Sequence, residues 1–197
     1  MRRKRQPQPS PPPQRPTPAE LRAARGRRVP DIVAPHLNIL FVGINPGLYS
    51  GAVGHHFARP GNRFWPALQR AGLTPRLFMP REERELLKYG IGITNIVKRT
   101  TAAASELSKK ELAAGGRRLA ATIKRLKPRV AAFLGIDAYR TAFGVRQVRV
   151  GSQPVVIGNA QIWVLPNPSG LNAHYQLKDF VRWFRRLRKR EKGANSV

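Results

Sequence analysis

Residues 37–43, Leu37-Asn38-Ile39-Leu40-Phe41-Val42-Gly43, form an apolar run that leads directly into Ile44-Asn45-Pro46-Gly47. Far downstream, Val164-Leu165 leads in the same way into Asn167-Pro168-Ser169-Gly170-Leu171. Both patterns predict a strand that ends abruptly in a turn carrying an uncharged Asn. In an open α/β sheet, ligands bind just beyond the carboxyl ends of the strands. Two such turns from one sheet can therefore place Asn45 and Asn167 on opposite sides of a single cleft.

From Leu37 onward, strand-like and helix-like segments alternate along the chain. Besides the strand at 37–43, the spacing of apolar residues predicts helices near 62–71, 81–88, 108–127, 136–143 and 180–187, and strands at 91–97, 129–134, 154–157 and 161–165. The pair Gly115-Gly116 inside a predicted helix indicates close packing at that point. Strands separated by helices predict an α/β fold, a three-layer α/β/α sandwich with a mostly parallel central sheet.

The first 35 residues differ in composition from the rest of the chain. They hold nine of the 18 prolines and nine basic residues, but only two acidic ones. Such a segment up to Pro16 buries too little apolar surface to fold alone, so we expect a basic, Pro-rich flexible tail over residues 1–35. Thr17-Pro18-Ala19-Glu20 has the pattern of a capping box, which predicts a short helix near 18–25. The folded domain is then expected over 36–190, followed by a flexible C-terminus at 191–197.

The charge of the chain indicates what it binds, and the absence of Cys and of a signal peptide indicates where it works. Lys and Arg total 37 against 10 acidic residues, a formal net charge of +27. This balance predicts strong attraction to a polyanion such as DNA. A membrane partner is not expected, because no segment is long and apolar enough to span a bilayer and no apolar stretch follows the basic start as in a signal peptide. An intracellular location is expected: cytoplasmic and nucleoid-associated in a bacterium, or nuclear in a eukaryote.

Most of the usual charged catalysts are missing from the pattern. The chain has no Cys, which excludes disulfides, thiolate-held iron–sulfur clusters and Cys-based zinc sites. The few carboxylates fall mostly on predicted helices among basic neighbours, where a surface ion pair is expected. A metal site at His55-His56 is conceivable, but no third ligand suggests itself, and no motif for a Ser or Thr nucleophile is present. No metal or organic cofactor is therefore implied, and the expected site is uncharged.

An uncharged site built around an Asn suits one class of reaction. The amide of Asn45 can hydrogen-bond a water, but it cannot take up a proton as a general base does. The reaction should then have a transition state that is already cationic and a leaving group that is already stable. Cleavage of the N-glycosidic bond to uracil fits, because the sugar develops oxocarbenium character and the uracil anion spreads its charge over two oxygens.

Three separated motifs, in this order, resemble the mismatch-specific uracil-DNA glycosylases, relatives of thymine-DNA glycosylase in the uracil-DNA glycosylase superfamily. They are Gly43-Ile44-Asn45-Pro46-Gly47-Leu48, Phe57-Ala58-Arg59-Pro60-Gly61-Asn62-Arg63-Phe64-Trp65 and Leu165-Pro166-Asn167-Pro168-Ser169-Gly170-Leu171. The resemblance extends from Thr17 to about Phe184. The missing Cys excludes the thiolate-cluster branch of this superfamily.

The resemblance implies roles for residues around the base. Asn45 matches the Asn that positions the attacking water, and Asn167 matches the Asn beside the scissile sugar. Phe57 matches the aromatic residue that stacks on the extruded base. The other positions that match the base pocket are Ile44, Gly47 and Ser50. Asn95 stands where a Lys is common, and its amide could widen the range of substrates.

The resemblance also implies how the enzyme would reach a base inside a duplex. Ser169, Gly170 and Leu171 match the wedge that fills the gap left by the flipped nucleotide, and an apolar wedge offsets part of the cost of extrusion. Ala173 stands where a basic residue often follows this wedge. Contacts to DNA phosphates are further expected from Arg59, Arg63 and Lys98.

The sequence therefore predicts a monomeric, monofunctional DNA glycosylase that removes uracil, notably opposite guanine, and other damaged pyrimidines from double-stranded DNA. The alternative is a non-catalytic nucleic-acid-binding protein on the same fold. An enzyme that acts on free nucleosides is disfavoured by the wedge motif and by the charge.

Overall fold

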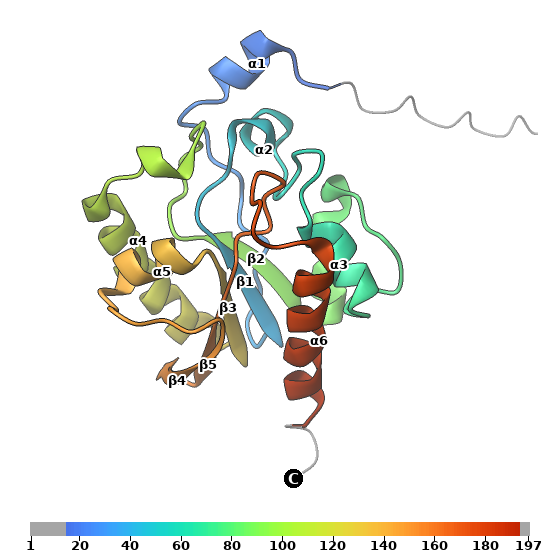
Figure 1. The fold of residues 1–197 in the computed structure, drawn as a ribbon, viewed down its shortest axis with the longest axis vertical. Coiled ribbons are helices and arrows are strands. Elements are labelled where there is room, and N and C mark those ends of the chain that lie inside the picture. Colours follow the sequence, from blue (N-terminus) through green and yellow to red (C-terminus); the bar gives the residue numbers. More distant parts are fainter. Residues whose placement is uncertain (1–14, 194–197) are drawn as a thin grey trace, which may run out of the picture.

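The computed structural model describes residues 15–193 (Figure 1). Its helices are α1 (Pro18–Ala23), α2 (Leu48–Val53), α3 (Phe64–Arg70), α4 (Lys109–Leu126), α5 (Ile136–Phe143) and α6 (Leu177–Gly193), with 3₁₀ helices η1 (Pro80–Tyr89) and η2 (Ala104–Glu106). Its strands are β1 (Ile39–Gly43), β2 (Ile91–Asn95), β3 (Val130–Leu134), β4 (Gly151–Ile157) and β5 (Ala160–Leu165). Residues 1–14 of the tail expected at 1–35, and residues 194–197 of the C-terminus expected at 191–197, lie outside the described residues.

The five strands form one sheet in the order β2-β1-β3-β5-β4. The four strands β2, β1, β3 and β5 are parallel, and β4 pairs antiparallel with β5 at the edge. The chain runs from β1 to β2 on one side and then returns to β3 on the other side. The strand order therefore reverses between β1 and β3, which is where open α/β sheets bind ligands. The predicted mostly parallel sheet is confirmed.

Alternate residues of each central strand face two separate cores. On one face, Phe41 of β1 packs against Phe64 of α3 and Phe184 of α6, with ring centroids 5.2 and 5.0 Å apart. On the other face, Leu40 and Val42 join the apolar sides of α4 and α5. Figure 1 shows α4 and α5 on one side of the sheet and α3 and α6 on the other, which is the predicted three-layer arrangement.

The two adjacent glycines of α4 mark the close packing that their sequence indicates. A Cβ on Gly116 would lie 2.5 Å from the carbonyl oxygen of Ala142 in α5, and one on Gly115 would collide with the carbonyl oxygen of Ile96. Real Cβ atoms do not approach this closely, so helix α4 can lie against its neighbours because both positions lack a side chain. Helix α4 begins, as expected, at a capping box in which Ser108 and Glu111 satisfy each other's backbone N–H groups.

Residues 17–32, expected from the sequence to belong to the flexible tail, pack against the rest of the domain. Helix α1 is present, with Thr17 and Glu20 forming the expected capping box. The segment after it is not a tail, because Ala24 is fully buried and Val29 and Ile32 are 3% exposed. Isolated β-bridges further join Arg28 to Arg99 and Ile32 to Ile93. Composition did not reveal this packing because three apolar residues, dispersed among arginines and prolines, suffice to dock the segment.

Candidate active site

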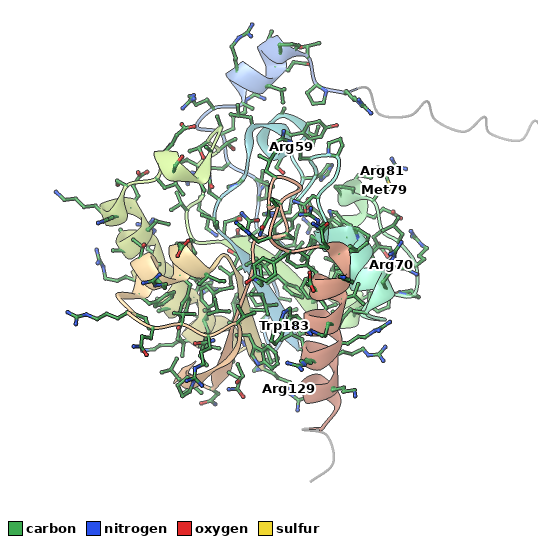
Figure 2. The ribbon with its side chains drawn as sticks, in the orientation of Figure 1. Arg59, Arg70, Met79, Arg81, Arg129 and Trp183 are labelled. Atoms are coloured by element: carbon green, nitrogen blue, oxygen red, sulfur yellow. The ribbon has the colours of Figure 1, made fainter. Side chains whose placement is uncertain are left out.

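The carboxyl ends of all four parallel strands meet at one pocket of about 630 Å³. Its wall contains Ile44 directly after β1, Asn95 at the end of β2, Leu134 at the end of β3, and Asn167 after β5. Helix α2 and the segment 56–62 close another side. Figure 2 shows Arg59 at this end of the molecule, near α2 and well away from Arg129 at the opposite end of the sheet. The two asparagines singled out from the sequence therefore line one cavity.

The amide of Asn45 has a defined orientation. The two hydrogens of its Nδ2 are shared among three acceptors: the carbonyl oxygens of Pro46 and Arg99, both at 3.1 Å, and Oγ1 of Thr101 at 2.7 Å. Because the Thr101 hydroxyl donates its own hydrogen to the carbonyl of Ala103 at 2.8 Å, its oxygen must act as the acceptor for Asn45. No group among residues 15–193 donates a hydrogen bond to Oδ1 of Asn45. Its acceptor oxygen is thus available to a molecule in the pocket.

The ring of Phe57 stacks on Phe64, with centroids 4.2 Å apart and planes inclined by 28°. Phe57 is half-buried and has φ 51°, a left-handed conformation that an aromatic residue rarely adopts. The surrounding segment is fixed by two hydrogen bonds: the buried carboxylate of Glu83 accepts from the backbone N–H of His56 at 2.8 Å, and Ser50 Oγ accepts from the N–H of Ala58 at 3.2 Å. These contacts hold the ring in the pocket wall against its local backbone preference.

Asn95 and His56 form a buried pair at the base of the pocket. The imidazole Nε2 of His56 lies 2.9 Å from the carbonyl oxygen of Pro30, which can only accept, so Nε2 carries a hydrogen. Burial lowers the pKa of His56 below its ordinary value of 6.5, which favours the neutral ring. Nδ1 then has a lone pair and accepts from Nδ2 of Asn95 at 3.3 Å. The Asn95 oxygen is directed away from the imidazole, in the space that a side chain on Gly43 would fill.

Asn167 is oriented in the opposite sense to Asn45. Its Oδ1 accepts from the backbone N–H of Ser169 at 3.1 Å, which leaves the amide hydrogens as the groups it can offer a ligand. Its backbone carbonyl accepts from the side chain of Asn172 at 3.0 Å. The pocket therefore has an amide oxygen on Asn45 and an amide N–H₂ on Asn167, one acceptor and one donor.

The loop after Asn167 projects an apolar side chain into solvent. Leu171 is 73% exposed, and the backbone N–H of Leu171 donates to Ser169 Oγ at 3.3 Å. Arg63 holds this loop from below: its backbone N–H donates to Pro168 O at 2.9 Å and its guanidinium to Ser169 O at 2.6 Å. A Cβ on Gly170 would lie 2.8 Å from Gly61 O, so the loop rests directly on the segment that follows Phe57.

Comparison with known proteins identifies the family of the chain. A sequence profile of the uracil DNA glycosylase superfamily matches residues 30–188. The chain belongs to the uracil DNA glycosylase superfamily. Its fold is also similar to the solution NMR structure of a candidate uracil DNA glycosylase from Methanosarcina acetivorans, with a TM-score of 0.57 and 21% sequence identity over 83% of this chain and 98% of that chain. At this identity, the likeness establishes a shared fold.

The superfamily fold brings together most of the site residues expected from the sequence. The pocket wall includes Asn45, Asn167, Ile44, Gly47, Ser50, Phe57, Asn95, Arg59, Ser169, Gly170 and Leu171. Two of the three basic residues expected to contact phosphates are not part of this wall. Arg63 lies behind the Leu171 loop, and Lys98 is paired with Asp31 at 2.7 Å and bonded to Thr94. Both side chains thus have contacts within the protein.

Sequence reasoning missed His56, Thr101 and Leu21 as residues of this pocket. His56 and Thr101 act through hydrogen bonds to the amides of Asn95 and Asn45, and such partners lie 39 and 56 residues apart in the chain. Leu21 reaches the pocket from α1. The capping box that predicts α1 was a usable signal for the helix, but nothing in the sequence indicates where the helix docks.

The pocket is almost free of charge. The described residues that line it include no Asp or Glu, and among them Arg59 alone is an Arg or Lys. Nor do residues 15–193 contain a group of three or more His, Cys, Asp or Glu side chains that could hold a metal ion. The imidazoles of His55 and His56 do not share a partner: His55 Nδ1 bonds Glu83 at 2.9 Å, while His56 bonds Asn95 and Pro30.

Within the described part of the chain, no helix combines the length and apolar character needed to cross a membrane.

Proposed function

We propose that this protein is a monofunctional DNA glycosylase that excises uracil, notably opposite guanine, and other damaged pyrimidines from DNA in base excision repair. The observation that supports it most is the oriented amide of Asn45. With Nδ2 held by three acceptors, Oδ1 can accept a hydrogen bond from a water in the pocket. That water attacks the sugar carbon while the sugar–base bond breaks. No proton acceptor stronger than an amide is needed, because the sugar carries most of the developing positive charge.

The fixed amide of Asn95 supports a uracil-like base as the substrate. A freely rotating amide can match either uracil or cytosine by exchanging its oxygen and nitrogen. The Asn95 amide cannot exchange them without losing its bond to the neutral imidazole of His56. Its oxygen therefore accepts from a base with N3–H, as uracil and thymine have. A cytosine in the same place would direct its N3 lone pair at this oxygen, and an unpaired buried polar group is costly.

Access to the pocket supports a flipped nucleotide as the reacting species. A base stacked in a duplex cannot reach the ends of the sheet strands, so it must leave the helix, which costs a few kcal/mol. The exposed Leu171 beside the pocket mouth is placed to fill the gap, and uracil opposite guanine is extruded more cheaply than a well-paired base. The formal charge of +27 favours DNA as the partner. We further propose that the protein acts as a monomer.

Substitution of Asn45 by alanine tests this function. We expect the single-turnover rate of uracil release from a G·U duplex to fall by about 100-fold or more, because the attacking water is no longer positioned. Affinity for the duplex should change little. Asn159→Ala serves as the matched control, since Asn159 is an exposed residue of the turn between β4 and β5. A wild-type protein that forms no abasic sites on any duplex of a modified-base panel would refute the proposal.

The competing function is a non-catalytic nucleic-acid binder on the same fold, which the charge alone would equally favour. The same experiment separates the two. A binder has no cleavage to lose, so wild type and Asn45→Ala would both bind duplexes and leave every base in place.

A further inference from the structure

The segment that joins α1 to the sheet lies next to the candidate active site, although it precedes the residues matched by the superfamily profile, 30–188. Helix α1 packs against α2, and its Leu21 lines the pocket. Ala24, which follows α1, has no exposed surface. Residues 25–28 after it are exposed, so it is their backbone contacts that show what they do there.

This segment is bonded to Thr100 through three hydrogen bonds. The backbone N–H of Gly26 donates to Thr100 O at 2.9 Å, and the backbone N–H of Thr100 donates to Arg27 O at 2.8 Å. The side-chain hydroxyl of Thr100 donates to the same Arg27 carbonyl at 2.8 Å. An antiparallel bridge between Arg28 and Arg99 extends the pairing by one residue.

The residues on either side of Thr100 hold the amide of Asn45. Arg99 O and Thr101 Oγ1 are two of the three acceptors for Asn45 Nδ2. The backbone N–H of Thr101 also donates to Pro46 O at 3.2 Å, and Gly47 and Thr101 form a parallel bridge. Residues 99–101 are thus the middle of three adjacent segments, with 26–28 on one side and 45–47 on the other.

Thr100 has little freedom to move between them. Its side chain is fully buried, and a Cβ on Gly51 of α2 would lie 2.6 Å from its Oγ1. Helix α2 therefore packs against Thr100 on one side, while residues 26 and 27 bond it on another. A displacement of Thr100 would carry Arg99 and Thr101 with it, because they are its neighbours in the chain.

We propose that residues 24–28 and Thr100 form a clamp that positions the Asn45 amide, which makes Thr100 a positioning residue of the site. The inference rests on the proposed role of Asn45 in holding the attacking water. It extends the functional site to a part of the chain that the superfamily profile does not include. Without the clamp, the acceptors of Asn45 Nδ2 shift and its Oδ1 no longer points steadily at the water.

Thr100→Val tests the clamp, because valine keeps the shape of the side chain and removes its hydroxyl. The matched control is Thr74→Val, since the buried Thr74 hydroxyl likewise donates to a backbone carbonyl, that of Arg76 at 2.9 Å, but lies outside the pocket lining. Each variant should lower Tm by about 2–4 °C. Thr100→Val should also lower the single-turnover rate of uracil release by about 10- to 100-fold at unchanged duplex affinity, whereas Thr74→Val should keep the wild-type rate.

A second measurement does not depend on activity. The side-chain N–H₂ resonances of Asn45, assigned by their loss in Asn45→Ala, should exchange slowly with solvent in the wild type and markedly faster in Thr100→Val. Equal rates and equal amide exchange in Thr100→Val and Thr74→Val would overturn the clamp. If the wild type releases no uracil, the proposed function fails by itself, and the amide exchange alone decides whether the clamp exists.

Gly26→Pro breaks the clamp from the other side. Proline removes the N–H that bonds Thr100 and cannot adopt the φ of +77° found at Gly26. Its control is Gly144→Pro, at a glycine with φ +66° whose N–H likewise donates to a carbonyl, at the end of α5. We expect Gly26→Pro to lose rate and Asn45 amide protection together, and Gly144→Pro to lose neither. Retention of both in a folded Gly26→Pro protein would contradict the inference.

Discussion

Each of three side-chain amides in the pocket wall has one end fixed by the protein. Asn45 is fixed through its nitrogen and presents oxygen, and Asn167 is fixed through its oxygen and presents nitrogen. Asn95 is fixed through its nitrogen by a histidine whose tautomer is itself set by Pro30 O. A neutral amide is a weak group, and it becomes selective when the protein removes its freedom to rotate.

The buried imidazole of His56 predicts a loss of stability in mild acid. Its pKa in the folded state is lowered, mainly by burial, so below about pH 6.5 the unfolded chain takes up a proton that the folded protein does not. The free energy of unfolding should then fall as the pH falls from 7 toward 5, by at most about 1.4 kcal/mol per pH unit. Its neighbours Glu83 and Asp31 oppose this shift and Lys98 favours it.

Urea unfolding at pH 7, 6 and 5 measures this effect, with His56→Asn as the comparison because asparagine does not titrate in this range. The free energy of unfolding of the wild type, relative to that of the variant, should decrease as the pH falls from 7 to 5. The acidic side chains Glu82 and Glu111 have pKa values lowered to about 2, chiefly by Arg76 and Arg99. Their contribution is present above about pH 4.5 and is lost below it, outside this window. A difference that stays constant from pH 7 to 5 would count against a neutral, buried His56.

At the scale of elements, the loop 167–172 and the segment 57–63 form one support. Arg63 bonds two consecutive carbonyls of the loop, and Gly170 rests on Gly61. The exposed Leu171 is therefore carried on a braced loop rather than a free one. Arg63, expected from the sequence to contact phosphate, bonds and supports this loop.

This bracing predicts a selective defect for Arg63→Gln. We expect uracil release from duplex DNA to fall about tenfold, which corresponds to the loss of one charged hydrogen bond. Release from single-stranded DNA should change little, because an unpaired base needs no wedge. The measurement compares the two substrates in single-turnover assays, with Arg70→Gln, an exposed arginine at the end of α3, as the control (Figure 2). Equal losses on both substrates would mean that Arg63 serves the base pocket instead.

At the scale of the whole molecule, the fold gathers the polar strand ends at one place while positive charge covers much of the surface. The parallel strands β2, β1, β3 and β5 all end at the pocket, and the side chains of α6 such as Trp183 cover the sheet farther away (Figure 2). The acidic residues are largely engaged in ion pairs with arginine or lysine, as in Arg99–Glu111 and Lys98–Asp31. Most of the basic excess is left to attract DNA.

The charge predicts a steep dependence of DNA affinity on salt. Each phosphate that the protein neutralises contributes about −0.9 to the slope of log K against log salt concentration. Replacement of Arg2, Arg3, Lys4 and Arg5 by glutamine should reduce the magnitude of this slope by at most about 4. The rate of uracil release at saturating DNA should not change, since these residues precede the described domain. Fluorescence anisotropy at 50–300 mM salt measures the slope, and an identical slope would show that the four residues make no DNA contacts.

Local patterns in the sequence determined the strands, most helices and the two Asn-bearing turns. Hydrophobic spacing and capping residues are local signals, and the motifs around Asn45, Phe57 and Asn167 sit at strand ends where a parallel sheet must bring them together. The tertiary structure decided what holds each amide and in which direction it points. Thr100, His56 and the segment at 24–28 act through a few hydrogen bonds across 39 to 73 residues of chain, and a contact between distant, individually ordinary residues leaves no periodic trace in a sequence.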